Sequence, residues 1–352
     1  MKNSIKSNWF PYRAKSFSLR AMCIYVTYRC NMRCRTCGIW KQNKHFEPHE
    51  LSKEEFDHVL SDSFFNNLEF ININGGEPNL RSDLIPLVRM LIAKFPRLHT
   101  VTMNSNGLPP SVMEKNATEI SRLCRSKGIN FSISLSMHKI GSGLDDITGI
   151  QNSYPQVKEA FDRLKKIREK QGFYLSANCV ISNLNLDSLD EMLSWSLEED
   201  IPVNFTLGEI RDRFNNQDMK DDVLIKPEAK EKLCGFFREL SKRKRTYLQH
   251  ALRYSELAEM LVSERTRRLS CHYAMAGVIL GSEGSLYYCK NSKAIGNCLE
   301  STATECFYDE DNLAYRTDTL LNERCLHCPP NTFNRIESEK DLFKILRHFI
   351  FK

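Results

Sequence analysis

The sequence predicts an α/β protein built on a parallel sheet, and three observations carry this prediction. Short strand patterns and amphipathic helical patterns alternate from Ala21 to about Leu207. The chain has 352 residues, 41% of them hydrophobic, which suffices for one large domain and a smaller one. No stretch approaches the ~18–20 apolar residues of a membrane span. Repeated β/α units of this kind predict parallel strands joined by crossover helices.

Six strands are expected between these limits. Their ranges are Ala21–Thr27, Leu68–Asn74, His99–Asn104, Asn130–Ser136, Phe173–Ile181 and Pro202–Leu207. The clearest helix is Pro155–Lys170, whose apolar residues recur at helical spacing. Another helix is expected to begin at a capping box of Ser52 and Glu55. Along the strands, one alternating set of residues is apolar and the other is polar. Since helices cover the apolar face, we expect the polar set to face inward; an antiparallel sheet with one solvated face is the alternative.

Three cysteines stand in the loop expected after the first strand. Cys30, Cys34 and Cys37 have the spacing C-x3-C-x2-C. A closed structural zinc site takes four protein ligands, whereas a catalytic metal keeps one position open. Thiolates suit an iron–sulfur cluster, and a cubane held by three cysteines leaves one iron free for another ligand. A zinc knuckle or three unrelated buried thiols are the alternatives.

A glycine-rich turn follows the second expected strand and reads Gly75-Gly76-Glu77-Pro78. Together with the cysteine spacing, this turn resembles the signature of the radical S-adenosylmethionine (SAM) family. The resemblance implies a partial (β/α)6 TIM barrel. It also implies a 4Fe–4S cluster on the three cysteines, with SAM on the open iron and Glu77 accepting from the SAM amino group. Gly75 and Gly76 are expected to let a ligand approach the backbone closely.

Two further strand ends are similar to SAM-contacting segments of the family. Ser105, within Asn104-Ser105-Asn106-Gly107, stands where many relatives have threonine, and Ser134 matches a serine that contacts SAM in several of them. Both are predicted to bind SAM; the alternative is hydrogen bonding within a turn or strand end. Departures from the family pattern are an aspartate, an arginine and an aromatic residue replaced by Ser136, Thr148 and Thr36.

Four more cysteines follow later in the chain. Cys271 and Cys289 flank Gly284 in the pattern C-x12-G-x4-C, and Cys325 and Cys328 follow as C-x2-C. Four thiols can ligate every iron of a second cluster. The arrangement resembles the Twitch domain, a short version of the SPASM domain, and implies one auxiliary 4Fe–4S cluster. A four-cysteine zinc site is the alternative. Cys298 or Cys306 is a possible replacement for one ligand.

These motifs divide the chain into five predicted parts. They are an N-terminal extension (1–20), a radical SAM core (21–208), a charged helical connector (209–270), an auxiliary-cluster domain (271–336) and a C-terminal amphipathic helix (337–352). The connector contains the basic run Lys242-Arg243-Lys244-Arg245. A hypothesis of another class is a zinc-bound scaffold or nucleic-acid-binding protein that uses both cysteine sets and this run. We expect no nucleic-acid partner.

The N-terminal sequence and the cysteine content predict the cellular compartment of the protein. The first twenty residues lack the apolar core and cleavage site of a secretory signal. Thirteen cysteines without such a signal favour metal binding or catalysis over disulfides, so a cytoplasmic location is expected. The net charge of +6 is compatible with an acidic partner but does not require one.

The family resemblance implies reductive cleavage of SAM to a 5′-deoxyadenosyl radical that abstracts a hydrogen atom. The expected substrate is a polar small molecule, such as a sugar or aminocyclitol, that is oxidised or rearranged. The auxiliary cluster is expected to accept an electron, and a flavodoxin- or ferredoxin-type protein to donate one. The alternative is a peptide or protein maturase that forms a thioether, a carbon–carbon crosslink or an epimer.

Two observations favour the small molecule: the polar strand set, and the 29 residues before Cys30, which are fewer than a leader-binding domain needs. No catalytic base is identified. Four titratable residues lie near strand ends or cluster ligands, and we expect each to be structural or solvated rather than catalytic: His138, Glu209, Asp212 and His272.

Overall fold

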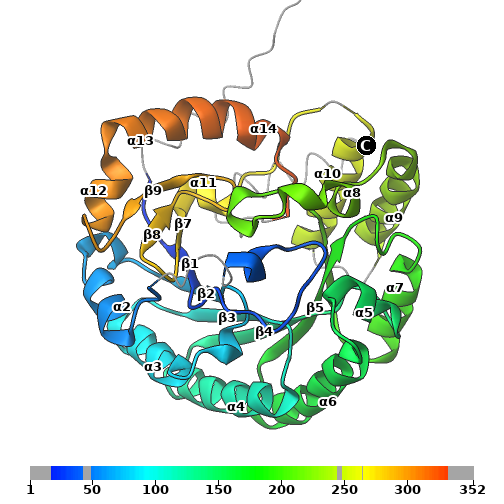
Figure 1. Ribbon diagram of the computed structural model, residues 1–352, viewed down its shortest axis with the longest axis horizontal. Coiled ribbons are helices and arrows are strands. Elements are labelled where there is room, and N and C mark those ends of the chain that lie inside the picture. The colour runs from blue at the N-terminus through cyan, green and yellow to red at the C-terminus, as the bar shows by residue number, and fades with distance from the viewer. Residues whose placement is uncertain (1–16, 43–48, 244–247, 264, 332–352) are drawn as a thin grey trace, which may run out of the picture. The chain divides into compact units, whose positions relative to one another are not determined.

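The computed structural model describes residues 17–42, 49–243, 248–263 and 265–331 (Figure 1). Its centre is a nine-stranded sheet in the order β6-β5-β4-β3-β2-β1-β7-β8-β9. The first six strands are β1 (Ala21–Tyr25), β2 (Phe70–Asn74), β3 (Thr100–Ser105), β4 (Asn130–Ser136), β5 (Tyr174–Ile181) and β6 (Val203–Leu207). Each of these pairs in parallel with the next. The sheet is not closed, which confirms the predicted open, partial barrel.

Helices cover the outer face of this sheet, as Figure 1 shows. They are α2 (Lys53–Val59), α3 (Leu84–Lys94), α4 (Pro110–Ser126), α5 (Gly143–Thr148), α6 (Ser153–Gln171) and α7 (Leu189–Glu198). The predicted capping box is present at the start of α2: Ser52 accepts from the Glu55 N–H, and the Glu55 carboxylate accepts from the Ser52 N–H. The long helix predicted from apolar periodicity corresponds to α6.

The predicted division of the strands into two faces is present. Apolar residues such as Ile71, Val101 and Ile133 are at most 1% exposed. The alternating polar residues between them, such as Asn72, Thr102 and Ser134, are half-buried. The apolar residues face the helices, so the polar set lies on the inner face of the barrel. The alternative of an antiparallel sheet is excluded by the parallel pairing.

The sheet continues past β1 with strands from much later in the chain. β7 (Gly277–Leu280) pairs in parallel with β1, and β8 (Ser285–Tyr287) and β9 (Ala294–Asn297) add antiparallel strands. The following helix α12 (Ala303–Tyr308) begins at a second capping box, formed by Thr302 and Glu305. The Asp62 carboxylate binds both the N–H and the hydroxyl of Thr304, at 2.8 and 2.7 Å.

The chain forms two compact units. The barrel unit comprises Leu19–Leu224 and Gly277–Asn312, and the helical unit comprises Met1–Ser18, Ile225–Ala276 and Leu313–Lys352. Described helices of the helical unit include α9 (Lys230–Lys242), α10 (Leu248–Val262) and α11 (His272–Ala276). Phe237 on α9 stacks on Tyr254 on α10 with ring centroids 5.6 Å apart. The predicted five-part division remains a prediction, and its C-terminal helix at 337–352 lies outside the described residues.

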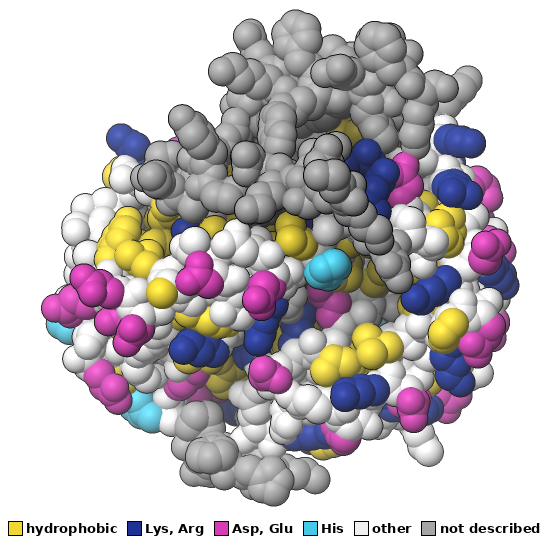
Figure 2. All heavy atoms as spheres, turned by 90° about the horizontal axis from the view of Figure 1, so that it is seen from above, with side chains coloured by type: hydrophobic (Ala, Val, Ile, Leu, Met, Phe, Trp, Pro, Cys, Tyr) yellow, Lys and Arg dark blue, Asp and Glu magenta, His cyan; other side chains and the backbone are white. Residues whose placement is uncertain are grey.

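The polarity of the helices and the distribution of surface charge concern two kinds of partner, lipid bilayers and charged macromolecules. Among the described helices, each is too short or too polar to cross a lipid bilayer. On the face that Figure 2 shows, the described acidic and basic side chains are interspersed rather than separated into fields of one sign. Of the basic run in the connector, Lys242 and Arg243 are described, and Arg243 pairs with Glu239 at 2.8 Å.

Candidate functional site

The cysteine loop follows β1 at the carboxyl end of the parallel strands, where barrel enzymes place their active sites. Loops after four other strands bind its backbone. The Glu77 N–H donates to Arg29 O at 2.7 Å, and the Asn31 side-chain amide donates to Leu108 O at 3.1 Å. The Arg33 N–H donates to Thr148 O at 2.8 Å, and the Asn216 side-chain amide donates to Thr36 O at 3.1 Å. These partners follow β2, β3, β4 and β6. The sheet therefore holds the loop from several sides.

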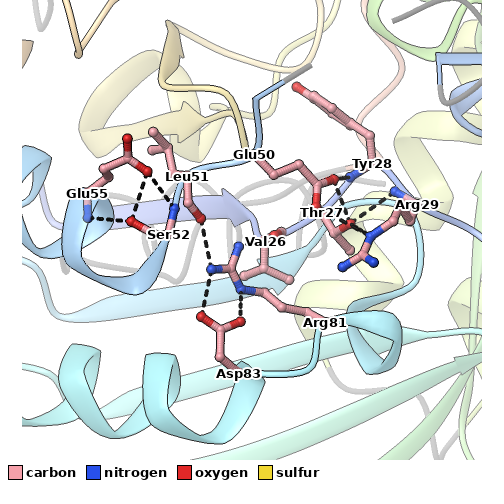
Figure 3. A network of polar contacts seen from close by, with 10 residues as sticks. All are labelled: Val26, Thr27, Tyr28, Arg29, Glu50, Leu51, Ser52, Glu55, Arg81 and Asp83. Atoms are coloured by element: carbon pink, nitrogen blue, oxygen red, sulfur yellow. Dashed lines mark hydrogen bonds and ion pairs between the residues drawn. The ribbon is translucent and has the colours of Figure 1, made fainter. Parts of the chain in front are cut away.

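The start of the loop is held by a half-buried carboxylate and a buried guanidinium, which Figure 3 shows. The Glu50 carboxylate accepts from the Thr27 hydroxyl and the Tyr28 N–H, at 2.7 and 2.8 Å. The guanidinium of Arg81 donates to Val26 O and Leu51 O, both at 2.8 Å, and pairs with Asp83. Because Arg81 is only 6% exposed, losing any of these partners would leave a costly unpaired charge.

The three thiols fit the ligand set of a cluster with one open position. Burial raises the pKa of Cys34, and the neighbouring Cys37 and Cys30 raise it further, so the three sulfurs lie within electrostatic reach of one another. The Asn106 amide lies 3.9 Å from the Cys30 sulfur. Among the described residues, no group of three His, Cys, Asp or Glu side chains is placed so that it could hold a metal ion, and a cluster on the three thiols remains a prediction.

Gly75 and Gly76 lie against the backbone of the cysteine loop, and SAM binding by either glycine remains a prediction. A Cβ on Gly75 would lie 2.2 Å from Thr27 O, and one on Gly76 would lie 2.2 Å from Arg29 O. Gly75 also has φ +135°, which side chains rarely adopt. The glycines therefore allow the turn after β2 to pack directly against the backbone of the cysteine loop.

Glu77 is buried within the protein, with an exposed fraction of 0%. One carboxylate oxygen accepts from the Asn79 N–H, the Asn79 amide and the Ser105 hydroxyl, at 3.0, 2.6 and 2.8 Å. The other accepts from the Asn106 N–H at 2.6 Å. Burial raises its pKa, and these four hydrogen bonds oppose that shift. In this structure Glu77 joins the turn after β2 to the turn after β3.

Replacing Glu77 with glutamine is expected to lower the free energy of unfolding by about 1–3 kcal/mol, because an amide N–H would face the Asn106 N–H. Urea denaturation measures the loss. Glu54→Gln is the matched control, since Glu54 is 73% exposed and pairs only at the surface with Lys53; its change should stay within about 0.5 kcal/mol. Equal effects of both substitutions would contradict the assigned role of Glu77.

The two predicted SAM-contacting serines lie in different surroundings. Ser105 is 4% exposed, donates to Glu77 and accepts from the Gly107 N–H at 2.9 Å. Ser134 lies half-buried on the inner face, where its oxygen accepts from the Ser176 hydroxyl at 3.0 Å. The structure therefore brings Ser105 together with Gly75–Glu77 around the cysteine loop, and places Ser134 on the barrel wall. SAM binding by either serine remains a prediction.

At least three of the four titratable residues near strand ends or cluster ligands make hydrogen bonds or ion pairs within the protein. Glu209, after β6, pairs with Lys290 at 2.8 Å and also with Arg211. Asp212 accepts from the Gln217 amide at 2.9 Å. His138 is 7% exposed, and its Nδ1 accepts from the Val180 N–H at 3.2 Å. His272 opens α11 in the helical unit. These contacts assign no base.

Burial lowers the pKa of His138 to about 4. In the unfolded chain the pKa of a histidine is near 6.5. Between about pH 6.5 and 4, the unfolded state therefore binds a proton at His138 that the native state does not bind. The free energy of unfolding falls as the pH is lowered through this range. His138→Gln should reduce this loss by up to about 3 kcal/mol at pH 4. Denaturant titrations from pH 7 to 4 test this. An unchanged pH dependence in His138→Gln would contradict this role of the buried ring.

The auxiliary cysteines are divided between the two units. Cys271, Cys325 and Cys328 belong to the helical unit, where the Arg267 N–H donates to Leu326 O at 2.7 Å and joins the two cysteine segments. Cys289 follows β8 in the barrel unit, and the Asn291 N–H lies 3.4 Å from its sulfur. Their joint role in an auxiliary cluster remains a prediction.

Cys298 and Cys306 form a separate pair in the barrel unit. They are 8% and 5% exposed, and burial, followed by the neighbouring Cys306, raises the pKa of Cys298 to about 12. A Cβ on Gly296 would lie 2.4 Å from the Cys306 sulfur, so this thiol is packed tightly against β9. Such packing favours a structural role over metal binding.

Several residues around the cysteine loop had no individual signal in the sequence. In the sequence Asn106 is one residue of a turn, yet in the structure its amide contacts both Cys30 and Asn31. Asn216, Glu50 and Arg81 lie far from the cysteines in sequence and act through backbone carbonyls or N–H groups. A chain pattern does not reveal such contacts, because many asparagines and arginines occur in loops.

The fold and the site together define a cofactor-dependent α/β barrel enzyme with a three-thiol loop. Comparison with known families gives the same answer: residues 24–195 match the model of the Radical SAM superfamily. The chain thus contains a radical SAM domain over these residues. Enzymes of this superfamily use a 4Fe–4S cluster and SAM, in agreement with the chemistry expected of the three cysteines.

Curated relatives include GTP 3′,8-cyclases. The one from Listeria welshimeri is 28% identical over 185 residues, which cover 52% of this chain and 52% of that protein. The one from Acidothermus cellulolyticus is 40% identical over 94 residues, covering 25% and 26% of the two chains. This chain thus spans about half the length of the Listeria relative that it matches.

Solved structures share the fold at low sequence identity. Streptococcus suis SuiB bound to S-adenosylmethionine has a TM-score of 0.60 and 14% identity, over 91% of this chain and 77% of SuiB. Native anSMEcpe with bound AdoMet has a TM-score of 0.56 and 17% identity, over 84% of this chain and 82% of anSMEcpe. At these identities the likeness concerns the fold.

Proposed function

We propose that this enzyme cleaves SAM reductively and uses the resulting radical to abstract a hydrogen atom from a polar small molecule, which is oxidised or rearranged. The cluster and SAM, when bound, supply the 5′-deoxyadenosyl radical. The chain supplies the three thiols, a cysteine loop held by neighbouring strand ends, and an inner face that receives the substrate. The observation that carries the substrate class is that this inner face is polar and half-buried on β2 to β6.

The comparisons lend support of two kinds. The GTP 3′,8-cyclases are named for a reaction of a nucleotide, which is a polar small molecule.

The second candidate is a peptide maturase, because SuiB also has a structure bound to its precursor peptide SuiA, with a TM-score of 0.58 to this chain. That likeness concerns only the fold, so we place the small molecule first.

The proposal has three accompanying parts. Cys271, Cys289, Cys325 and Cys328 hold an auxiliary 4Fe–4S cluster that accepts the electron left on the substrate. A flavodoxin- or ferredoxin-type protein delivers the electron that cleaves SAM. The enzyme acts in the cytoplasm, where thiols stay reduced.

Anaerobic reconstitution tests the proposal. The protein should bind about eight irons with matching sulfide, four per cubane, and should form 5′-deoxyadenosine when reduced in the presence of SAM. Fewer than about four irons per chain, or a colourless zinc protein, would overturn the radical mechanism. Mass spectrometry of the nucleoside and colorimetric iron and sulfide counts supply the measurements.

A further inference from the structure

A row of side-chain amides crosses the inner face of the barrel. The Asn204 amide donates to Asn178 Oδ1 at 3.0 Å, Asn178 to Asn104 Oδ1 at 3.3 Å, and Asn104 to Asn72 Oδ1 at 3.5 Å. Asn74 also donates to Asn72 Oδ1, at 3.2 Å, and Asn72 donates to the Thr102 hydroxyl. We call Asn72, Asn104, Asn178 and Asn204 the amide row; its three amide-to-amide hydrogen bonds run from β6 toward β2.

The row passes over β4 because this strand presents only small side chains there. Asn104 on β3 is paired with Ser134, and Asn178 on β5 is paired with Ser136. Larger side chains at these two positions would stand between the amides, whereas serines leave room for Asn178 to reach Asn104. The row therefore depends on the small side chain of Ser136.

Asn104 and Asn178 keep hydrogen-bonding capacity beyond the row. A primary amide has two N–H donors and an oxygen with two lone pairs. Within the row, each of these two residues uses one N–H and accepts one hydrogen bond. The row fixes which way each amide points, and both side chains are half-buried on the inner face. Each can thus offer a donor and an acceptor in a fixed orientation to a ligand.

The row lies beside the cysteine loop. Asn104 is two residues before Asn106, whose amide lies 3.9 Å from the Cys30 sulfur. No inward-facing residue of β2 to β6 is charged: the described set is Phe70, Asn72, Asn74, Thr100, Thr102, Asn104, Asn130, Ser132, Ser134, Ser136, Tyr174, Ser176, Asn178, Val180, Asn204 and Thr206. An ionised group placed against these strands would lose water without gaining a counter-ion.

Resting on the proposed function, we infer that Asn104 and Asn178 determine substrate specificity by binding hydroxyl groups of a neutral, hydroxyl-rich ring compound. A hydroxyl both donates and accepts, which matches the capacity that each amide retains. The reacting part of the substrate carries no charge where it meets β2 to β6. Charged groups of a nucleotide find no counter-ion on these strands.

The test is a binding and activity panel on the reconstituted protein with SAM. The compounds are myo-inositol and glucose as neutral polyols, glucosamine as a cation, GTP as an anion and a short neutral peptide. Calorimetric titration gives the affinities, and the ratio of 5′-deoxyadenosine formed with and without each compound gives the response. Wild-type protein should bind a neutral polyol more tightly than GTP or the peptide, and the ratio should rise with that polyol alone.

Two substitutions and one control complete the test. Asn178→Leu keeps the volume but removes the amide, and should weaken polyol binding by about tenfold, the equivalent of one good hydrogen bond. Asn178→Asp should weaken polyol binding likewise and shift preference toward glucosamine, an effect that simple loss of packing would not produce. Ser126→Ala, at an exposed position on α4 away from the inner face, should change neither affinity nor ratio.

Some outcomes overturn the inference while leaving the proposed function intact. They are a response to GTP or the peptide, no response to either polyol, or unchanged polyol affinity in Asn178→Leu, each with 5′-deoxyadenosine still formed by the wild type. If the wild type forms no 5′-deoxyadenosine under reducing conditions, the proposed function itself fails. The two failures are therefore distinguishable.

Discussion

Cys34→Ala is expected to reduce iron by about four atoms per chain and to abolish 5′-deoxyadenosine formation. Three thiols in one loop are the ligands that this domain offers, and Cys34 is the one whose pKa both of the others raise. With two thiols left, a cubane would have two irons without protein ligands. Iron and sulfide counts with single-turnover SAM cleavage measure the effect.

A second cysteine provides the control for this experiment. Cys124 is buried on the outer helix α4 with an exposed fraction of 0%, away from the strand ends that hold the loop. Cys124→Ala removes one small buried group, so it should cost stability without affecting iron content or SAM cleavage. If Cys34→Ala kept full iron and full 5′-deoxyadenosine yield, the three-thiol site would be disproved.

Cys289→Ala is expected to remove about four irons and to stop substrate turnover, while SAM cleavage in the absence of substrate continues. The reason is that Cys289 belongs to the proposed auxiliary ligand set and not to the cysteine loop. Cys325→Ala should give the same result, because the same cluster would lose a ligand. Iron counts and product analysis by mass spectrometry separate the two clusters.

Cys298→Ala is the matched control for the auxiliary site. Cys298 lies on the same segment as Cys289 but is packed against Cys306. Its replacement should leave all irons in place. If Cys298→Ala lost the irons and Cys289→Ala kept them, the ligand assignment would have to be exchanged. If Cys325→Ala turned over substrate at the wild-type rate, the redox role of the auxiliary cluster would be withdrawn.

The sequence was most informative where structure follows from local pattern. The alternation of apolar and polar residues located all six barrel strands, since each strand has one face toward helices and one toward the inside. The capping box at Ser52 and Glu55 is also a local arrangement, and it was predicted correctly. The spacing of the three cysteines in the loop predicts a cluster site, because a cluster needs its ligands close together, and their role as ligands remains a prediction.

Features that depend on contacts distant in sequence were not predictable. Nothing near Gly277 indicates that β7 will pair with β1. The inward direction of the Glu77 carboxylate depends on the turn at Ser105 and Asn106, which a motif search does not place. The same holds for Asn178, whose amide reaches Asn104 only because an intervening strand has small side chains. Sequence pattern identifies such residues as polar but not as partners.

The pairing of β1 with β7 has a consequence for how the chain folds. Ala21 stands opposite Gly277, so this edge of β1 has no partner until most of the chain has been synthesised. Pairings over such a separation form slowly, and an unpaired edge strand invites contact with other chains. Truncation before β7 would leave that edge permanently open. Expression of the first 224 residues alone should therefore give aggregates, and high yields of cluster-loaded enzyme should require conditions that slow synthesis or supply chaperones.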